Sequence, residues 1–224
     1  MKPLEARGLH RFYRRGGNEV AALLDVTLTC DAGETVAVTG ASGSGKSTLL
    51  GLLAGVDDPD GGSVHVAGLR LSHQSPAVSA RLRAQYIGVL TQSSGLLGHL
   101  SVLENVRFAA SLRSGSGAAP DELLEGLGLR LVRQSRPRTL SGGESARAGL
   151  AVALAGAPAV LLADEPTAEV SGAEEDTILD LLRRWRPRDG ATVIVTHSGP
   201  VAAHADRIVH LTDGRLHRGD AVVA

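Results

Sequence analysis

The sequence predicts an α/β fold built around a mostly parallel sheet. Uninterrupted apolar and β-branched runs at residues 34–40, 159–164 and 191–197 alternate with helical stretches, as in strands that are covered on both faces. Residues 4–39 contain several expected strands before any helix, which indicates an antiparallel β piece at the N-terminus. Residues 92–156 contain helices and no convincing strand, which indicates a helical subdomain inserted between two sheet strands.

The chain length of 224 residues fits one domain with a subdomain inside it. We therefore assign residues 1–224 to a single domain, in which residues 1–91 and 157–224 form the core and residues 92–156 form the helical subdomain. The remaining expected elements are strands at 63–68 and 86–90, helices at 47–55, 101–113, 121–129, 142–156 and 173–185, and a final hairpin that turns at Asp213-Gly214.

The composition excludes several classes of protein. The formal net charge is −1, so we expect no nucleic-acid partner, since such partners select a basic excess. A single cysteine, Cys30, excludes an intrachain disulfide, and its place in an alternating stretch predicts a small core residue. The N-terminus lacks the apolar run of a signal peptide, and no stretch approaches the ~20 apolar residues of a membrane span. We expect a soluble protein whose role at a membrane requires a partner.

The stretch GASGSGKST, residues 40–48, fits the phosphate-loop pattern G-x-x-x-x-G-K-[ST] between an expected strand and an expected helix. Glycines let consecutive backbone N–H groups curl around an anion, and the helix that starts there adds its positive dipole end. The competing interpretation, a glycine-rich turn before a helix, does not account for this order of strand, loop, lysine, hydroxyl and helix. The residues that we expect to bind the nucleotide here are Gly40, Ser42, Gly43, Gly45, Lys46, Ser47 and Thr48.

The use of lysine rather than arginine at position 46 has a chemical reason. Among the 23 Lys and Arg residues, only Lys2 and Lys46 are lysines. The lysine ammonium is a compact charge on a flexible stem that can reach the β and γ phosphates, whereas the planar guanidinium of arginine is bulkier. Ser47 would offer its hydroxyl to Mg²⁺. We expect ATP as the nucleotide, although the loop alone does not separate ATP from GTP.

A carboxylate pair follows a second apolar run in the sequence VLLADEP, residues 160–166. Asp164 would lie at the carboxyl end of a buried strand, where ligands bind in open α/β sheets, and could hold Mg²⁺ through its water shell. Glu165 beside it could act as a general base or orient water for attack on the γ phosphate. The alternative is an ordinary loop start, but the phosphate loop in the same chain favours the catalytic interpretation.

The pentapeptide LSGGE, residues 140–144, resembles the signature motif of the ABC ATPases, a family of P-loop NTPases. A plain helix start is the alternative, because Ser141 and Glu144 have capping-box spacing. The resemblance implies that Ser141 and the backbone amides of Gly142 and Gly143 bind the γ phosphate of an ATP held by a second ATPase subunit. Each ATP would then lie between two subunits of a head-to-tail dimer.

Other elements of this family follow in order, and the resemblance covers residues 4–218. Tyr13 matches the aromatic residue that stacks on adenine, against the alternative of a small β-sheet core. Gln92 matches the glutamine that senses Mg²⁺ and links to the transmembrane partner. His197 matches the switch histidine that contacts the γ phosphate, against the alternative of a structural histidine at a strand end. The resemblance therefore implies ATP hydrolysis with Glu165, His197 and Gln92 as catalytic residues.

The sequence departs from the family pattern at three positions. Ser171 stands where the family has an aspartate, and we expect it to cap the next helix together with Glu174. A serine cannot supply a carboxylate across the dimer interface, so we expect altered communication between the two ATP sites. Glu144 replaces a glutamine and Val152 an arginine. These changes would suit a slower enzyme or one that works beside a non-identical partner.

Among subfamilies, the sequence looks most like the ATPases of the macrolide-exporter and lipoprotein-release type. This likeness implies an ATPase subunit on the cytoplasmic face of the membrane that powers a separate transmembrane permease, for export or for release of lipophilic or lipoprotein cargo. We expect two copies of this chain in the dimer rather than two different subunits. A non-transport ATPase that sends a mechanical signal through a permease-like partner, as in cell-wall hydrolysis, and a stand-alone soluble ATPase are the alternatives.

We predict that Ser171→Asp raises the ATPase rate or its cooperativity in ATP, because the variant restores the carboxylate that the family places at the subunit interface. Steady-state ATP hydrolysis measured against ATP concentration checks this prediction. An unchanged rate and Hill coefficient would mean that this loop does not limit turnover.

Overall fold

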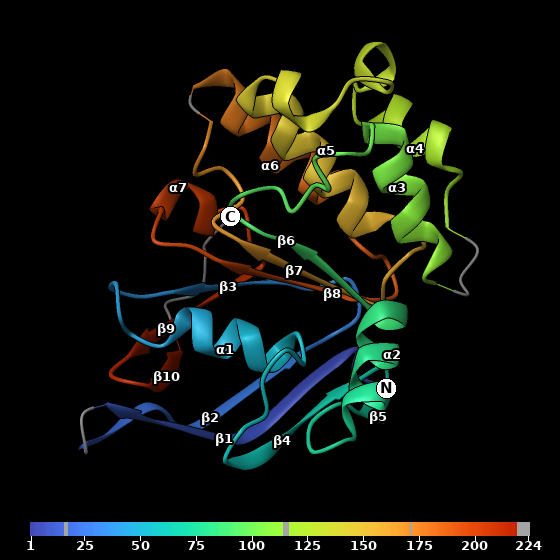
Figure 1. Cartoon of the computed structure of the whole chain (residues 1–224). Coiled ribbons are helices and arrows are strands. Elements are labelled where there is room, and N and C mark those ends of the chain that lie inside the picture. The colour runs from blue at the N-terminus through green and yellow to red at the C-terminus, as the bar shows by residue number, and fades with distance from the viewer. Residues whose placement is uncertain (16–17, 114–116, 171, 219–224) are drawn as a thin grey trace.

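The structure is a computed structural model that describes residues 1–15, 18–113, 117–170 and 172–218. Two sheets and a set of helices form its layers (Figure 1). The larger sheet crosses the middle of the molecule. Most helices cover one of its faces, while helices α1 (Lys46–Leu53) and α2 (Pro76–Tyr86) and the smaller sheet lie on the other side.

The larger sheet has six strands in the order β10-β9-β3-β8-β7-β6. All neighbours in it pair in parallel except the edge hairpin of β9 and β10, which is antiparallel. The prediction of a mostly parallel core sheet is confirmed. The strands are β3 (Thr35–Thr39), β6 (Ile87–Leu90), β7 (Val160–Asp164), β8 (Ala191–Val195), β9 (Arg207–Thr212) and β10 (Arg215–Arg218).

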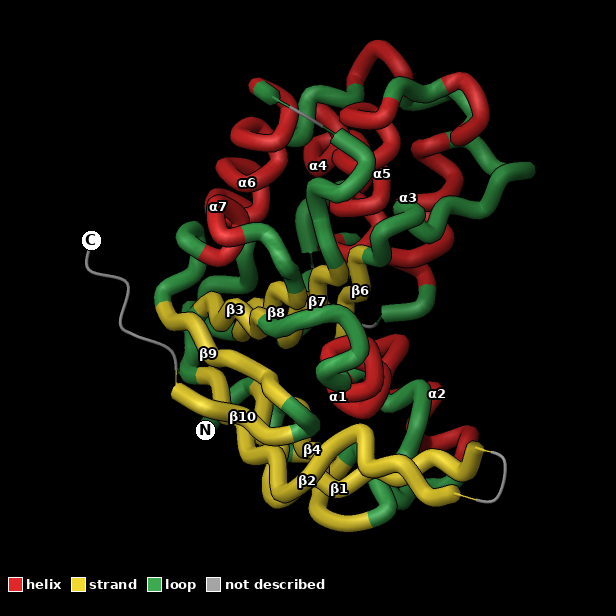
Figure 2. Tube along the Cα trace, turned by 90° about the vertical axis from the view of Figure 1, so that its left-hand side faces the viewer, coloured by secondary structure: helices red, strands yellow, loops and turns green. Residues whose placement is uncertain are grey.

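The smaller sheet is antiparallel and contains the N-terminal strands, as the sequence predicts. Its order is β2-β1-β4-β5. β1 (Leu4–Arg15) and β2 (Asn18–Cys30) are long and pair with several register shifts, while β4 (Gly61–Val66) and β5 (Leu69–Arg70) complete the sheet. Helix α1 (Lys46–Leu53) lies between the two sheets, as the turned view shows (Figure 2). The core therefore continues from the smaller sheet through α1 to the larger one.

Alternate residues of the central strands face two different cores. Leu162 of β7 and Val193 of β8 pack toward α1, whereas Leu161 and Ile194 pack toward the helices on the opposite face. This alternation explains why these strands read as continuous apolar runs. The covering helices are α3 (Val102–Ser111), α4 (Pro120–Gly126), α5 (Gly142–Leu154) and α6 (Ala173–Trp185), with short turns η1 (Arg130–Val132) and η2 (Pro137–Thr139) between α4 and α5.

The described residues between β6 and β7 form only helices, helical turns and loops. The predicted helical insertion is therefore confirmed, and it joins two strands that are direct neighbours in the sheet. Two of its helices start with capping boxes, in which Ser101 pairs with Glu104 and Ser141 with Glu144. The division into residues 1–91, 92–156 and 157–224 stays a prediction.

One detail differs from the prediction. Helix α2 (Pro76–Tyr86) was not expected, because it buries none of its residues fully and shows no apolar periodicity. Helix α6 follows Gly172, and Glu174 in its first turn pairs with Arg147 at 3.4 Å. Ser171 lies outside the described residues, so the expected cap by Ser171 and Glu174 stays a prediction. A short helix, α7 (Gly199–Ala202), follows β8.

We predict that native Cys30 resists thiol reagents and weakens the fold at high pH. Its side chain is fully buried, and burial raises the pKa of the thiol from 9.0 to about 12. The folded state therefore keeps its proton where the unfolded state loses it, so the free energy of unfolding should fall as pH rises from about 9 toward 12. Denaturant unfolding between pH 8 and 11 checks this slope, with Cys30→Val as the control that reduces it. Rapid labelling of the folded protein would contradict the prediction.

Candidate functional site

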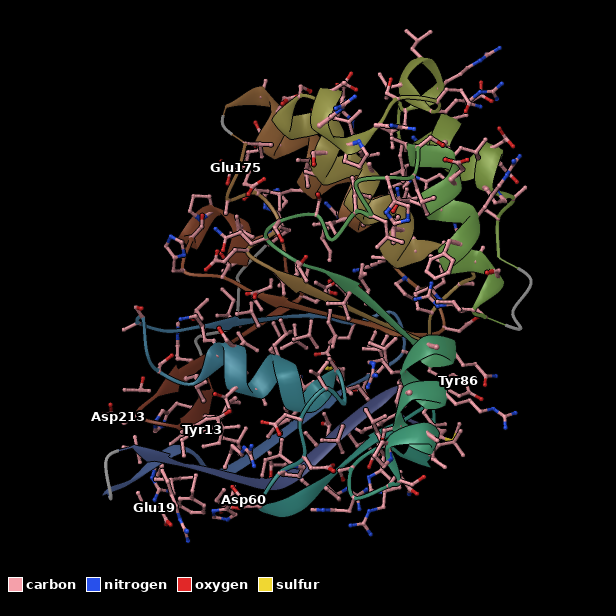
Figure 3. All side chains as sticks on the ribbon, viewed as in Figure 1. Tyr13, Glu19, Asp60, Tyr86, Glu175 and Asp213 are labelled. Atoms are coloured by element: carbon pink, nitrogen blue, oxygen red, sulfur yellow. The ribbon has the colours of Figure 1, made fainter. Side chains whose placement is uncertain are left out.

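A cavity of about 690 Å³ opens at the carboxyl ends of the parallel strands. Segments from β1, β2, the loop after β3, and the ends of β6, β7 and β8 meet there, and Tyr13 lies beside the phosphate-loop end of α1 (Figure 3). The predicted site residues that line it are Tyr13, Ser42, Gly43, Gly45, Lys46, Ser47, Thr48, Gln92, Asp164, Glu165 and His197. The fold thus brings together residues that are up to 184 positions apart in the sequence, from Tyr13 to His197.

The sequence did not single out the wall that β2 adds to the cavity. Val20, Ala21 and Ala22 line it together with Val195 at the end of β8. No chemical pattern marks these small apolar residues, and only the pairing of β2 with β1 places them opposite the loop. They give the cavity an apolar side next to the aromatic ring of Tyr13.

Glycine is required at two positions of the phosphate loop by close packing. Gly40 has φ 155° and Gly45 has φ 105°, both in the region that favours glycine. A Cβ atom at Gly40 would overlap the carbonyl oxygen of Leu211 in β9, and one at Gly45 would overlap the carbonyl oxygen of Ala22 in β2. The loop is therefore held between elements of both sheets. Gly40 does not line the cavity itself but supports the loop from behind.

The Lys46 side chain folds over the mouth of the loop. Its Nζ atom donates hydrogen bonds to the carbonyl oxygens of Gly40 at 2.7 Å and Ala41 at 2.9 Å. These two bonds hold the ammonium group against the start of the loop. Ser47 and Thr48 follow in the first turn of α1, where the helix dipole favours an anion. The arrangement concentrates positive potential at one end of the cavity.

The two carboxylates line the same cavity as Lys46. Asp164 ends β7, and burial together with the neighbouring charge of Glu165 raises its pKa, an effect that Lys46 opposes. A bound cation would relieve this repulsion. Ser47, Gln92 and Asp164 supply neutral and charged oxygen atoms around the same cavity, a donor set that suits Mg²⁺ bound together with nucleotide phosphates. The residues present therefore fit the expected metal.

Glu165 is held in a strained and fully bonded position. Its φ of 45° lies in the left-handed region, which costs of order 1 kcal/mol for a residue with a side chain. Its Oε1 atom accepts a hydrogen bond from the His197 backbone N–H at 2.9 Å and faces the His197 Nδ1 atom at 2.5 Å. Its Oε2 atom accepts one from the Thr196 hydroxyl at 2.8 Å. The sequence placed Glu165 and His197 at the site but gave no sign of their direct contact or of Thr196.

Tyr13 stands at the edge of the cavity and not in a core. It is 42% exposed, so the alternative of a buried β-sheet aromatic is wrong. The guanidinium of Arg11 lies 5.0 Å from the centre of its ring, and Arg11 is fixed in turn by two hydrogen bonds to Asp57 at 2.9 and 2.7 Å. A flat ring supported in this way can stack on a planar base.

The signature residues lie outside this cavity. Ser141 and Gly142 are exposed at the N-terminus of α5, while Gly143 is buried. A Cβ at Gly142 would come within 2.8 Å of the Glu169 backbone carbonyl oxygen, while one at Gly143 would require the Glu174 carboxylate to move. A single chain therefore presents a phosphate loop and a signature segment as two separate surfaces.

The layered fold, the phosphate loop and the carboxylate pair define an ATPase of the P-loop class with a helical insertion. The ABC transporter family matches residues 23–168, and the chain belongs to this family. The chain is 42% identical to the uncharacterized ABC transporter ATP-binding protein YbbA of Escherichia coli K12, over 95% of this chain and 96% of that protein. It is 40% identical to the macrolide export ATP-binding/permease protein MacB of Rhodopirellula baltica, over 94% of this chain. The chain spans only 32% of the length of that MacB protein.

Solved structures give the same result. The ATP-binding cassette MJ0796, in a dimeric post-hydrolysis state bound to ADP and Pi, superposes with a TM-score of 0.89 at 29% identity over 99% of both chains. A second dimeric structure of MJ0796, a bacterial ABC transporter cassette, gives a TM-score of 0.87. The predicted family, fold and ATPase activity are confirmed. Among the described residues, no helix has the length and apolar character needed to cross a bilayer.

We predict that Lys46→Ala and Lys46→Arg both weaken ATP binding by about 10- to 100-fold, the loss expected for a charged hydrogen bond. Arginine keeps the charge but brings a planar group that does not fit the loop. Titration with a fluorescent ATP analogue measures the affinity, and thermal unfolding of each variant controls for the fold. Wild-type affinity in Lys46→Arg would contradict the role given to the shape of lysine.

Proposed function

We propose that the chain is the ATPase subunit of an ABC transporter and that it works as a head-to-tail dimer that closes on ATP. The observation that carries this proposal is the separation of the two phosphate-binding surfaces. Residues Ser42, Gly43 and Gly45 to Thr48 of the phosphate loop line the cavity, whereas Ser141, Gly142 and Gly143 do not. Two copies related by a two-fold axis can place the signature of one over the loop of the other. The dimeric state of the MJ0796 cassettes supports this arrangement.

In this dimer each ATP links two subunits. Neither surface contacts the nucleotide fully by itself, so ATP binding favours closure through contacts that exist only in the closed state. Hydrolysis replaces one anion by two, and repulsion between them favours opening. The exposed position of Ser141 at the start of α5 suits contact with a phosphate bound by another chain.

The roles of the cavity residues follow from their chemistry. Tyr13 stacks on adenine, Ser42, Gly43, Gly45, Lys46, Ser47 and Thr48 hold the phosphates, and Gly40 supports their loop. Ser47, Gln92 and Asp164 hold Mg²⁺, which neutralises phosphate charge when it is bound. Glu165 orients the attacking water and accepts its proton, and His197 contacts the γ phosphate. The direct contact between Glu165 and His197 supports their joint action.

The partner is a transmembrane permease that holds the ATPase at the cytoplasmic face of the membrane and contacts it near Gln92 and the helical insertion. Three apolar side chains are exposed in this region, namely Leu97 at 39%, Phe108 at 50% and Leu112 at 53%. MacB and the probable syringafactin export protein SyfD of Pseudomonas syringae, 38% identical to this chain, are named as combined ATP-binding and permease proteins. We therefore propose export, or release of lipophilic cargo, as the process that this ATPase powers.

We predict that Glu165→Gln forms a dimer only when ATP is present. This variant should bind ATP without hydrolysing it, since the amide cannot accept the proton of the attacking water. Size-exclusion chromatography with and without Mg-ATP measures the change from monomer to dimer. The double variant Lys46→Ala/Glu165→Gln is the control and should stay monomeric.

A Glu165→Gln protein that binds ATP and remains a monomer would contradict an ATP-driven homodimer. Wild-type hydrolysis by Glu165→Gln would contradict the role of Glu165 itself. The two results are independent, so each part of the proposal is tested by itself.

A further inference from the structure

We infer that Thr196 is a positioning residue for catalysis, because its buried hydroxyl fixes the carboxylate of Glu165 in the orientation that activates water. The inference rests on the proposed role of Glu165. Thr196 directly follows β8 and directly precedes His197. It does not line the cavity, and no motif of the sequence marked it.

The hydroxyl of Thr196 has a defined direction. Its Oγ1 atom accepts a hydrogen bond from the backbone N–H of Ser198 at 3.0 Å. The same oxygen lies 2.8 Å from Oε2 of Glu165. An ionised carboxylate only accepts hydrogen bonds, so the hydroxyl proton must point to Glu165. The Ser198 contact thus orients the hydroxyl, and the hydroxyl orients the carboxylate.

The residue that carries this hydroxyl is rigid. Thr196 is fully buried, and its backbone N–H donates a hydrogen bond to the carbonyl oxygen of Val38 in β3 at 3.1 Å. The centre of the parallel sheet therefore holds its backbone, and burial holds its side chain in one rotamer. A buried threonine on a rigid strand end is a fixed reference point for the flexible side chain of a glutamate.

The two oxygen atoms of Glu165 depend on different groups. Oε1 is held by the backbone and the ring of His197, and the backbone contact would survive most substitutions. Among the described residues, Oε2 accepts its one hydrogen bond from Thr196. Loss of this bond would leave the carboxylate attached at one oxygen and free to rotate about it. The strained backbone of Glu165, at φ 45°, indicates that the chain is held to deliver the carboxylate to this place.

Orientation of a general base changes the rate of the chemical step more than the affinity for the substrate. A displacement of about 1 Å at a catalytic group can cost about 100-fold in rate. Thr196 does not face the nucleotide cavity, so its hydroxyl should not change ATP affinity. The expected signature is a lower kcat for ATP at unchanged KM and unchanged ATP-driven dimerisation.

The test compares Thr196→Val, Thr196→Ala and Thr196→Ser in the full chain. Valine keeps the volume without the hydroxyl, alanine avoids any steric conflict, and serine keeps the hydroxyl. We expect kcat to fall by about 10- to 100-fold in the valine and alanine variants and to remain near wild type in the serine variant. Thermal unfolding identifies which variants are folded.

Thr192→Val is the matched control. Thr192 lies in β8, the strand that Thr196 follows, is 1% exposed, and its hydroxyl has no hydrogen-bond partner among the described residues. The same chemical change four residues away should leave kcat unchanged. Thr196→Val in the Glu165→Gln background should still dimerise with ATP, which shows that the binding surfaces are intact.

Wild-type kcat in a folded Thr196→Val or Thr196→Ala variant would overturn the inference, and so would an equal loss in Thr196→Ser. A raised kcat would overturn it as well, because it would mean that Thr196 holds Glu165 in a resting position. These results leave the proposed function in place if the wild type hydrolyses ATP and Glu165→Gln does not. A wild type without ATPase activity, or an active Glu165→Gln variant, would instead overturn the proposed function.

Discussion

The shape of the phosphate loop is the constraint on which the rest of this structure depends, because this shape concentrates positive potential where the phosphates bind. The loop contains glycines at positive φ, and such a loop is stable only where neighbouring elements enforce its shape. Here Gly40 packs on the carbonyl oxygen of Leu211 and Gly45 on that of Ala22, so both sheets contact the loop. The smaller sheet therefore shapes the site as well as adding core. It also delivers Tyr13 and an apolar wall to the same cavity.

The second constraint on the site is the repulsion between its two neighbouring carboxylates, Asp164 and Glu165. Placing Asp164 next to Glu165 in a half-buried position disfavours ionisation of Asp164, as its raised pKa reflects. The backbone directs the two carboxylates to different partners. Asp164 stays on the strand, near the loop, while Glu165 turns back through a left-handed backbone to bond with the turn at 196–198. Thr196 links this turn to the centre of the sheet through Val38.

The sequence was sufficient for the fold class and for most of the cavity. Strands covered on both faces have long apolar runs, and a phosphate loop needs glycines and a lysine at fixed spacing. Both features are therefore recognisable in the sequence alone. Helix α2 was not visible because it buries none of its residues fully. Thr196 was not visible because a threonine at a strand end has no special spacing, and its role depends on the folding of Glu165 toward it.

One ATP should join the loop of one chain to the signature of another, and cross-linking between two variants that each carry one introduced cysteine tests this most directly. Ser42 and Ser141 are both exposed, and native Cys30 is buried and does not interfere. Ser42→Cys and Ser141→Cys, each in the Glu165→Gln background, are mixed and oxidised with and without ATP. A head-to-tail dimer should give a disulfide-linked product in the mixture with ATP and none from either variant alone. A dimer formed by Ser42→Cys with itself, or no ATP-dependent product in the mixture, would contradict the head-to-tail arrangement.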